Sequence, residues 1–338
     1  MSDADRPLLP SKAQLHVRWG QLYGSATSLW LAEAARKASG PLLVIAADAR
    51  QASRMEDELR FFCEPGSHIG HFSVEHFPAW ETLPYDLFSP HPDIVSQRLR
   101  MLSTLPRLAK GIVVVDLETA LQRLPPQTYI DAHAFDLSAG EVLDVAAFRD
   151  RLSGAGYLAS SQVMAPGEFA VRGSIIDLYP MGSPTPYRID LFDDEVESIR
   201  VFDPETQRSG ERAQALRLLP AREFPLTADG IQNFKRRFRN RFPGDLTRMA
   251  IYRDIAEGAP PPGIEYYLPL FFDATATLFD YLPGNTIVAA ETDTQGAAAQ
   301  VFAEIASRHA QRAHDAERPI LEPAAVFAPV EELVQRLA

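Results

Sequence analysis

The sequence predicts an α/β fold in which helices cover a parallel sheet and an α+β domain rich in antiparallel strands is inserted. Short apolar runs at 42–47 and 112–115 alternate with helical patterns, which is typical of a parallel sheet covered on both faces. Strand and turn signals replace this alternation from about 129 to 222, and the alternation then resumes. We therefore expect residues 1–128 and 223–338 to form the α/β domain, with C-terminal helices, and 129–222 to form the inserted domain.

The first part of the chain alternates helices and strands. Ser25 or Thr27 can cap a helix that ends near Ala38, and a buried-type strand follows at 41–47. Apolar residues at helical spacing predict the later helices, and prolines end them. The further elements expected here are a helix at 49–62, a helix at 94–105, a strand at 112–115 and a helix that Asp116 caps.

The inserted domain is expected to contain one short helix, at 145–152, and otherwise strands and turns. Within it, the segment 168–203 predicts three antiparallel strands, at 175–179, 187–192 and 196–202. The prolines of 180–186 stop the first strand, because proline cannot extend a ladder. In the second strand a period of two sends Arg188, Asp190 and Phe192 away from the apolar face. An aromatic ring beside an arginine on a polar face is typical of a protein-binding hot spot. The alternative is that Phe192 lies under a neighbouring loop or helix.

Beyond residue 222 the helical patterns return. The elements expected there are helices at 231–241, 247–257 and 297–316, a turn at Pro283-Gly284, a strand at 286–290 and an amphipathic segment at 330–338. The chain stops on that segment without a tail, and we expect it to be part of a longer protein.

Composition restricts the class of protein. The 338 residues are 46% hydrophobic and 23% charged, which is typical of a globular chain of two or three domains. The formal net charge of −12 argues against a non-specific nucleic-acid binder and favours protein partners. A single cysteine, Cys63, and the lack of a secretory signal favour the cytoplasm. No apolar run is long enough to cross a membrane.

The segment 21–28, QLYGSATS, is compared with the phosphate-binding pattern GxxxxGK[ST]. Gln21 and Ala26 stand at the two glycine positions, although Gly24 lies between them. Thr27 replaces the lysine that would neutralise the phosphates, and Ser28 keeps its hydroxyl. We interpret the segment as a degenerate nucleotide loop; an ordinary loop-to-helix junction is the alternative.

Other polar clusters have simpler structural explanations. The spacing of His68, His71 and His76 matches no metal-ligand pattern, so we expect solvated histidines and no metal site. The acidic tripeptide 193–195 is explained by a tight turn, and Asp116 with Glu118 by a helix cap.

A basic run could contact nucleic acid, but a solvated helix face is the commoner explanation of such a pattern. The cations of this run are Lys235, Arg236, Arg237, Arg239 and Arg241.

The segments GEFAVRGSIIDLYPMGSPTPYRIDLFDDEVESIRVFD, WETLPYDLFSPHPDIVSQRL and PPGIEYYLPLFF resemble the N-terminal part of the bacterial transcription-repair coupling factors, over about residues 15–335. The resemblance implies a module similar to the damage-recognition protein UvrB: a degenerate P-loop NTPase-like domain with an inserted domain that docks onto UvrA. Its UvrA contacts fall on Arg172 in FAVRG and on Arg188 and Phe192 in YRIDLF. Unlike UvrB, the sequence has an eroded phosphate loop and no aromatic-rich hairpin for gripping DNA.

The resemblance also implies what the longer protein does. Such a protein displaces RNA polymerase stalled at a lesion with an ATP-driven double-stranded DNA translocase and recruits UvrA for nucleotide excision repair, and its C-terminal domain masks the UvrA face. We therefore expect this chain to be a non-catalytic adaptor without a cofactor, because the motor that uses ATP lies outside it. The alternatives are a nucleic-acid-binding module and a residual nucleotide-binding domain.

Overall fold

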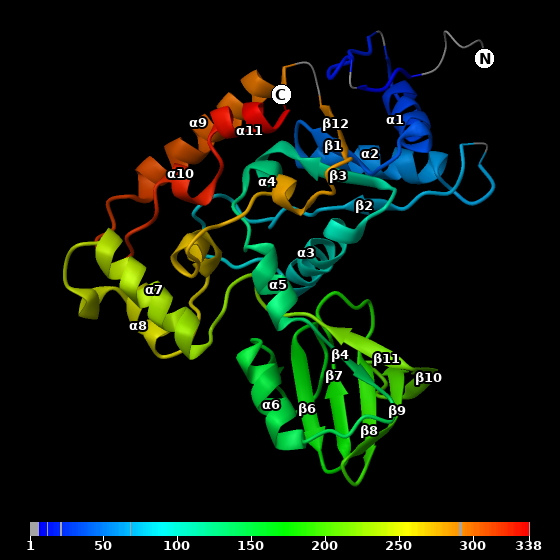
Figure 1. Cartoon of the computed structure of the whole chain (residues 1–338). Coiled ribbons are helices and arrows are strands. Elements are labelled where there is room, and N and C mark those ends of the chain that lie inside the picture. The colour runs from blue at the N-terminus through cyan, green and yellow to red at the C-terminus, as the bar shows by residue number, and fades with distance from the viewer. Residues whose placement is uncertain (1–6, 12, 21, 68, 291–292, 338) are drawn as a thin grey trace.

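The computed structural model describes residues 7–11, 13–20, 22–67, 69–290 and 293–337. Figure 1 shows a parallel sheet with helices on both faces and, below it, an antiparallel sheet with a helix beside it. This is the fold class that the sequence predicts, and the prediction is confirmed.

The parallel sheet is built from strands on both sides of the insertion. Its strand order is β12 (Ile287–Ala290), β1 (Leu42–Ala46), β3 (Ile112–Asp116) and β2 (Val74–His76). Because successive residues of a strand point to opposite faces, β1 contributes to two cores. Leu42 and Val44 pack with residues of α1 (Ala26–Lys37) and α2 (Ala49–Phe62), whereas Leu43 and Ile45 belong to a larger core on the other face.

The larger core is covered by the remaining helices of this domain. These are α3 (Pro92–Thr104), α4 (Leu117–Leu121), α5 (Gln127–His133), α7 (Ala228–Arg241), α8 (Ala250–Ala256), α9 (Thr294–Arg312), α10 (Pro323–Val326) and α11 (Val330–Leu337). Short 3-10 helices at Leu105–Arg107, Leu246–Arg248, Ile264–Leu270 and Leu278–Tyr281 join them. Within the described part of the chain, no helix combines the length and apolarity needed to span a membrane.

The inserted domain lies between α5 and α7 and has two sheets. The larger sheet has the order β10 (Ser209–Ala213), β9 (Glu195–Phe202), β8 (Tyr187–Phe192), β7 (Ile175–Leu178), β6 (Glu168–Arg172) and β5 (Leu158–Ala159). All neighbours are antiparallel except β5 and β6. The smaller sheet pairs β11 (Ala215–Leu218) with β4 (Phe135–Ser138). Helix α6 (Val145–Gly154) packs Phe148 and Leu152 into the core under the larger sheet.

Three expectations differ from the structure. The region 129–222 was expected to hold one helix, but α5 begins before it at Gln127 and runs to His133. Pro125 and Pro126 suggested the end of a unit, yet Pro126 stands at the N-cap of α5, a position where the missing proline N–H is harmless. The helix expected at 247–257 is divided into a 3-10 turn and α8. Ser25 occupies the N-cap of α1, but its side chain makes no capping hydrogen bond.

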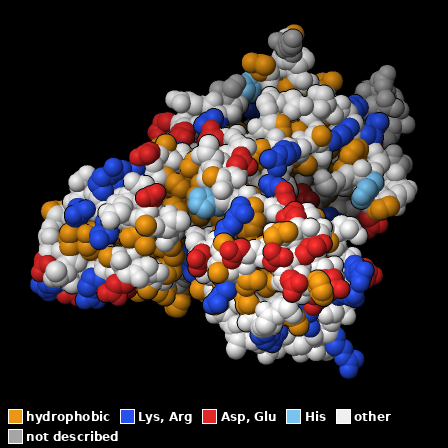
Figure 2. Space-filling view, turned by 60° about the horizontal axis from the view of Figure 1, so that its bottom comes forward, with side chains coloured by type: hydrophobic (Ala, Val, Ile, Leu, Met, Phe, Trp, Pro, Cys, Tyr) orange, Lys and Arg blue, Asp and Glu red, His pale blue; other side chains and the backbone are white. Residues whose placement is uncertain are grey.

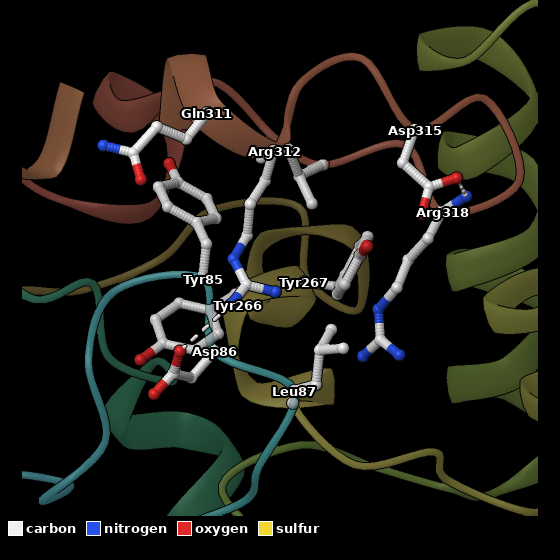
Figure 3. A pocket seen from close by; sticks show the side chains of 11 residues that line it. Tyr85, Asp86, Leu87, Tyr266, Tyr267, Gln311, Arg312, Asp315 and Arg318 are labelled. Carbon is white, nitrogen blue, oxygen red and sulfur yellow. Dashed lines mark hydrogen bonds and ion pairs between the residues drawn. The ribbon is translucent and has the colours of Figure 1, made fainter. Parts of the chain in front are cut away.

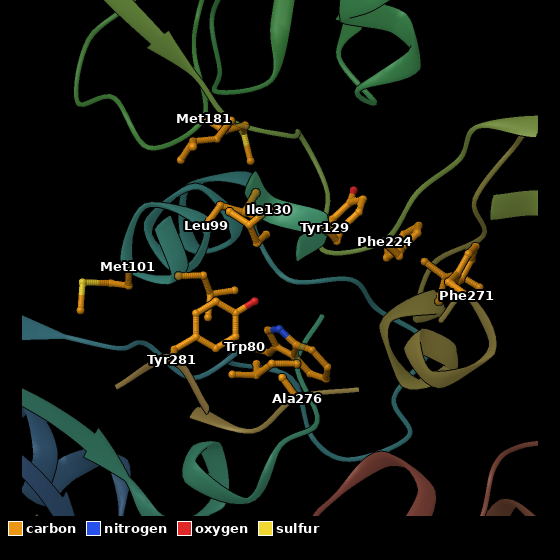
Figure 4. Close-up of a cluster of buried hydrophobic side chains, with 14 of the residues drawn as sticks. Trp80, Leu99, Met101, Tyr129, Ile130, Met181, Phe224, Phe271, Ala276 and Tyr281 are labelled. Carbon is orange, nitrogen blue, oxygen red and sulfur yellow. The ribbon is translucent and has the colours of Figure 1, made fainter. Parts of the chain in front are cut away.

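The inserted domain is fixed against α3 and α5 by polar and apolar contacts. The Gly182 amide donates to Ser96 Oγ at 2.8 Å, and the Tyr129 hydroxyl donates to the Arg222 carbonyl at 3.0 Å. Gly182 has a φ of +82°, and a Cβ there would lie 2.8 Å from a Leu219 methyl group, so the close approach requires glycine. Apolar side chains from both domains meet in one continuous core, part of which is drawn in Figure 4.

A buried ion pair lies at the same junction. Arg98 Nε and Nη2 donate to the carboxylate of Glu223 at 2.5 and 3.3 Å, and both side chains are almost fully buried. Arg98 Nη1 also donates to the Pro78 carbonyl at 2.8 Å. The pair therefore ties α3 to the segment that leaves the inserted domain.

Candidate partner-binding face of the antiparallel sheet

The larger antiparallel sheet has one face on the core and one turned away from it. Residues paired directly across antiparallel strands share a face. The register pairs Asp177 with Arg188, and Arg188 with Arg200, in one row of the outer face. The next row contains Arg172, which is paired with Ile175. The sheet thus places the two arginines of the candidate site on neighbouring rows of one face.

A buried carboxylate holds both arginines. Arg188 Nε donates to Asp177 Oδ1 at 2.7 Å and Arg188 Nη2 to Oδ2 at 2.9 Å, while Arg172 Nη2 also donates to Oδ2. Asp177 is fully buried, and its hydrogen bonds raise the pKa of Arg188 above the ordinary value. Arg188 Nη1 donates to the Gln207 carbonyl at 3.1 Å.

The two arginines differ in what they offer to a partner. The Arg188 side chain is 17% exposed and its guanidinium is occupied on both edges, whereas the Arg172 side chain is 48% exposed. The sequence suggested two arginines suited to forked hydrogen bonds with a partner carboxylate. In the structure the Nε–Nη2 fork of Arg188 already binds Asp177, so Arg172 is the more accessible cation. Sequence reasoning missed Asp177, although the period of two places it on this face.

Phe192 projects from the end of β8 and is 70% exposed. The alternative that this ring lies under a loop or helix is therefore wrong. Phe192 pairs with Glu195 across a tight turn in which Asp193 has a φ of +53°, a conformation that aspartate tolerates better than most residues. A bulge in β9 opposite Asp190 and Leu191 leaves the alternation of β8 intact.

Part of the outer face is covered. Val163, from the loop between β5 and β6, is fully buried against Ala170 and Phe202, with Tyr179 beside them. This small cluster closes the half of the face near Tyr179. The open part therefore lies toward Arg172 and the hairpin with Phe192. On the side of the inserted domain that Figure 2 shows, acidic, basic and hydrophobic side chains are interspersed.

The degenerate nucleotide loop leads into α1. Gln21 lies outside the described residues; Gly24 has a φ of +55°, and Ala26 and Thr27 form the first turn of α1. The buried Ser28 hydroxyl donates to Glu58 Oε2 on α2 at 2.6 Å. The one side chain that matches the phosphate-loop pattern is thus hydrogen-bonded to a carboxylate, whose charge would repel phosphate.

The basic run lies on α7, which buries Phe234 and Phe238. Its cations contact their own chain: Arg237 and Arg236 pair with Asp273, Arg239 Nε donates to the Lys235 carbonyl at 3.1 Å, and the Lys235 ammonium lies 5.9 Å from the Tyr252 ring. Arg241 is exposed in the last turn. These contacts are typical of a solvated helix face that also stabilises its own domain.

His71, His76 and Asp116 have hydrogen-bonding partners within the chain. His76 Nδ1 lies 2.7 Å from Glu56 Oε2, and His71 Nδ1 lies 3.2 Å from the Cys63 carbonyl; His68 lies outside the described residues. Among the described residues, no group of three or more His, Cys, Asp or Glu side chains could hold a metal ion. Asp116 accepts the Thr119 amide at 3.0 Å, as expected of a cap.

A cavity of about 250 Å³ was not anticipated from the sequence. Figure 3 shows this cavity between the loop that carries residues 85–87, the 3-10 helix Ile264–Leu270 and the end of α9. Tyr85, Tyr266 and Tyr267 supply aromatic walls, and Arg312 pairs with Asp86 at 3.3 Å across it. Two of the three sequence segments that carry the family resemblance line this cavity. Their resemblance is the sequence signal that could have indicated the cavity.

Comparison with known proteins first assigns the inserted domain to a class. The family model of the UvrB interaction domain matches residues 135–224, which span the antiparallel strands and the return to α7. The chain is 39% identical over all of its 338 residues to the transcription-repair-coupling factor of Escherichia coli, and 39% identical over 334 residues (98% of the chain) to that of Haemophilus influenzae. The corresponding protein of Bacillus subtilis is 29% identical over 79% of the chain.

These matches cover 29%, 28% and 23% of the three relatives, so the chain spans less than a third of their length. The chain belongs to the family of the transcription-repair-coupling factors.

Proposed function

We propose that this chain is a recruiting module that binds UvrA through the outer face of its antiparallel sheet, in bacterial nucleotide excision repair. The observation that carries the proposal is Phe192, which is 70% exposed on a tight hairpin of the UvrB interaction domain. An aromatic ring held open to solvent on the same sheet face as an accessible arginine has the composition of a binding hot spot. Burial of such a ring in a pocket of the partner supplies the apolar part of the binding energy.

The arginines have different parts in this proposal. Arg172 presents the outer part of its guanidinium to a carboxylate of UvrA, while Asp177 fixes its orientation. Arg188 is a positioning residue, because its bonds to Asp177 and to the Gln207 carbonyl are made within the chain. Pre-organised side chains lose little freedom on binding, which favours affinity.

The module is proposed to act without turning over ATP. The Ser28 hydroxyl is bound by Glu58, and Thr27 stands where a phosphate loop has its lysine. Equilibrium binding of labelled ATP to the chain tests this point. We expect no saturation up to millimolar nucleotide, and saturable micromolar binding would contradict the proposal.

The longer protein is proposed to be cytoplasmic and to displace stalled RNA polymerase with an ATP-dependent translocase acting on double-stranded DNA, from domains outside these 338 residues. In that protein a C-terminal domain is proposed to mask the UvrA-binding face. UvrA should then bind this chain more tightly than the longer protein. Equal affinities would contradict the masking.

Calorimetric titration with UvrA tests the binding face. Phe192→Ala should weaken binding by about 30-fold or more, the loss that corresponds to about 2 kcal/mol at a hot spot. Arg172→Ala should also weaken binding. Phe61→Ala, which removes an exposed aromatic side chain on α2, outside the antiparallel sheet, is the matched control and should bind as the unmodified chain does. Unchanged affinity for both Phe192→Ala and Arg172→Ala would refute the assignment.

A further inference from the structure

A short segment before α6 extends the sheet beside the hairpin that carries Phe192. The Val196 amide donates to the Glu141 carbonyl at 2.8 Å, the Gly140 amide donates to the Val196 carbonyl at 2.8 Å, and the Leu143 amide donates to the Asp194 carbonyl at 2.6 Å. These bonds pair Val142 with Glu195 in antiparallel register.

Glu195 is therefore paired on both sides. Its partner on β8 is Phe192, and its partner on the added segment is Val142. Directly paired residues share a face, so Phe192, Glu195 and Val142 form one row across three neighbouring segments. With about 4.8 Å between adjacent strands, the two apolar residues stand about 10 Å apart with the carboxylate between them.

This row is open to solvent. Val142 is 73% exposed and Phe192 is 70% exposed, and Glu195 is also exposed. Among the ion pairs of the described residues, none involves Glu195. The backbone of Val142 is fixed by its neighbours' hydrogen bonds, so its apolar side chain is held outward by the sheet rather than by a mobile loop.

Charged side chains are distributed unequally along this face, with acidic residues at one end and basic residues further along. Asp193, Asp194 and Glu197 are exposed beside Glu195 at the hairpin end, whereas Arg172, Arg200 and Arg212 lie on rows further along the same sheet. A partner with the complementary order of charges can dock in only one orientation.

We propose that Val142 and Glu195 extend the UvrA-binding face, so that UvrA places a lysine or arginine on Glu195 between two apolar contacts. This inference rests on the proposed function, because the row is continuous with Phe192. The extension adds an acidic and an apolar contact to the aromatic ring and the two arginines of the proposed face.

The test is calorimetric titration of UvrA with single variants of this chain at two salt concentrations. Val142→Ala should weaken binding about fivefold to tenfold, and Glu195→Lys should weaken it at least tenfold by placing a cation against a cation. Glu195→Gln should weaken binding less at high salt than at low salt, because the lost attraction is screened. Asp150→Asn, which neutralises an exposed carboxylate on α6, and Phe61→Ala, which removes an exposed ring on α2, are the matched controls.

The outcomes separate this inference from the proposed function. Wild-type affinity in Val142→Ala and Glu195→Lys together with a loss in Phe192→Ala overturns the extension and leaves the UvrA face in place. Wild-type affinity in Phe192→Ala and Arg172→Ala overturns the proposed function itself. Because the side chains of Val142, Glu195 and Phe192 are exposed, unchanged thermal unfolding of their variants shows that any loss of affinity arises at the interface.

Discussion

Replacing Arg98 by methionine should destabilise the chain by about 3–5 kcal/mol, because the substitution leaves the carboxylate of Glu223 buried without its partner. The side chain lost makes two hydrogen bonds to Glu223 and one to the Pro78 carbonyl. Its guanidinium also lies 4.6 Å from the Phe77 ring and 5.0 Å from the Trp80 ring. Methionine fills much of the same volume, so the loss reports mainly on charge and hydrogen bonding.

Urea unfolding followed by far-ultraviolet circular dichroism measures the change. Arg100→Met, on the same helix, is the control: Arg100 pairs with Glu75 at 2.7 Å but is 40% exposed, so its loss should stay below about 1 kcal/mol. The double variant Arg98→Met/Glu223→Leu removes both charges and should recover most of the stability. A loss below about 1 kcal/mol in Arg98→Met, or a double variant no more stable than the single one, would refute this reasoning.

Three further predictions concern other buried groups. In urea unfolding, Arg188→Met should destabilise the chain by about 3 kcal/mol and Arg172→Met by about 1 kcal/mol or less. The difference arises because Asp177 loses the partner that binds both of its oxygens only in the first variant. Equal losses of stability would contradict this. Burial raises the pKa of Glu265 to about 7, so the folded state binds the proton more tightly and stability falls as pH rises from about 4.5 through 7. Glu265→Gln should remove the part of that dependence that this carboxyl causes, leaving the part due to Glu118, whose pKa burial also raises to about 7. The variant should be about 3 kcal/mol more stable than the unmodified chain at pH 8; parallel stability profiles from pH 5 to 8 would show that Glu265 contributes nothing to it. Burial also raises the pKa of the Cys63 thiol to about 11. At pH 8, iodoacetamide should therefore modify Cys63 at least about 100-fold more slowly in the folded chain than in urea, as followed by mass spectrometry. Equal rates of modification would exclude a buried thiol.

Much of the α/β domain could be predicted because its signals are local. The helix expected at 49–62 is α2, and the strands expected at 41–47 and 112–115 are β1 (Leu42–Ala46) and β3 (Ile112–Asp116). The period of two placed Phe192 on the face opposite the apolar one, and the structure shows that no loop or helix of the described chain covers the ring. Helix α5 was missed because a pair of prolines has two meanings, the end of one element or the start of the next.

The environment of the arginines could not be predicted in the same way. Asp177 meets Arg188 because the loop 180–186 sets the register of β7 against β8, and the shape of a loop with three prolines is not readable from a periodic pattern. The tyrosine-lined cavity joins residues around 85, 266 and 312, and sequence patterns do not record such distant contacts. Local periodicity therefore identified the face, and long-range packing determined which side chains on it are accessible.

The parallel sheet has a consequence for the order in which the chain acquires its structure. Leu42 on β1 pairs with Ile287 on β12, whereas every strand of the inserted domain lies within 135–218. As the ribosome delivers the chain from its N-terminus, the inserted domain has all its strands long before β12 emerges. The flank of β1 that β12 later occupies is then an unpaired edge, which makes the nascent chain prone to wrong association. The inserted domain forms contacts between residues close in sequence, whereas the parallel sheet pairs strands that are far apart in sequence. Pairing of β12 with β1 should therefore be the slow step of folding.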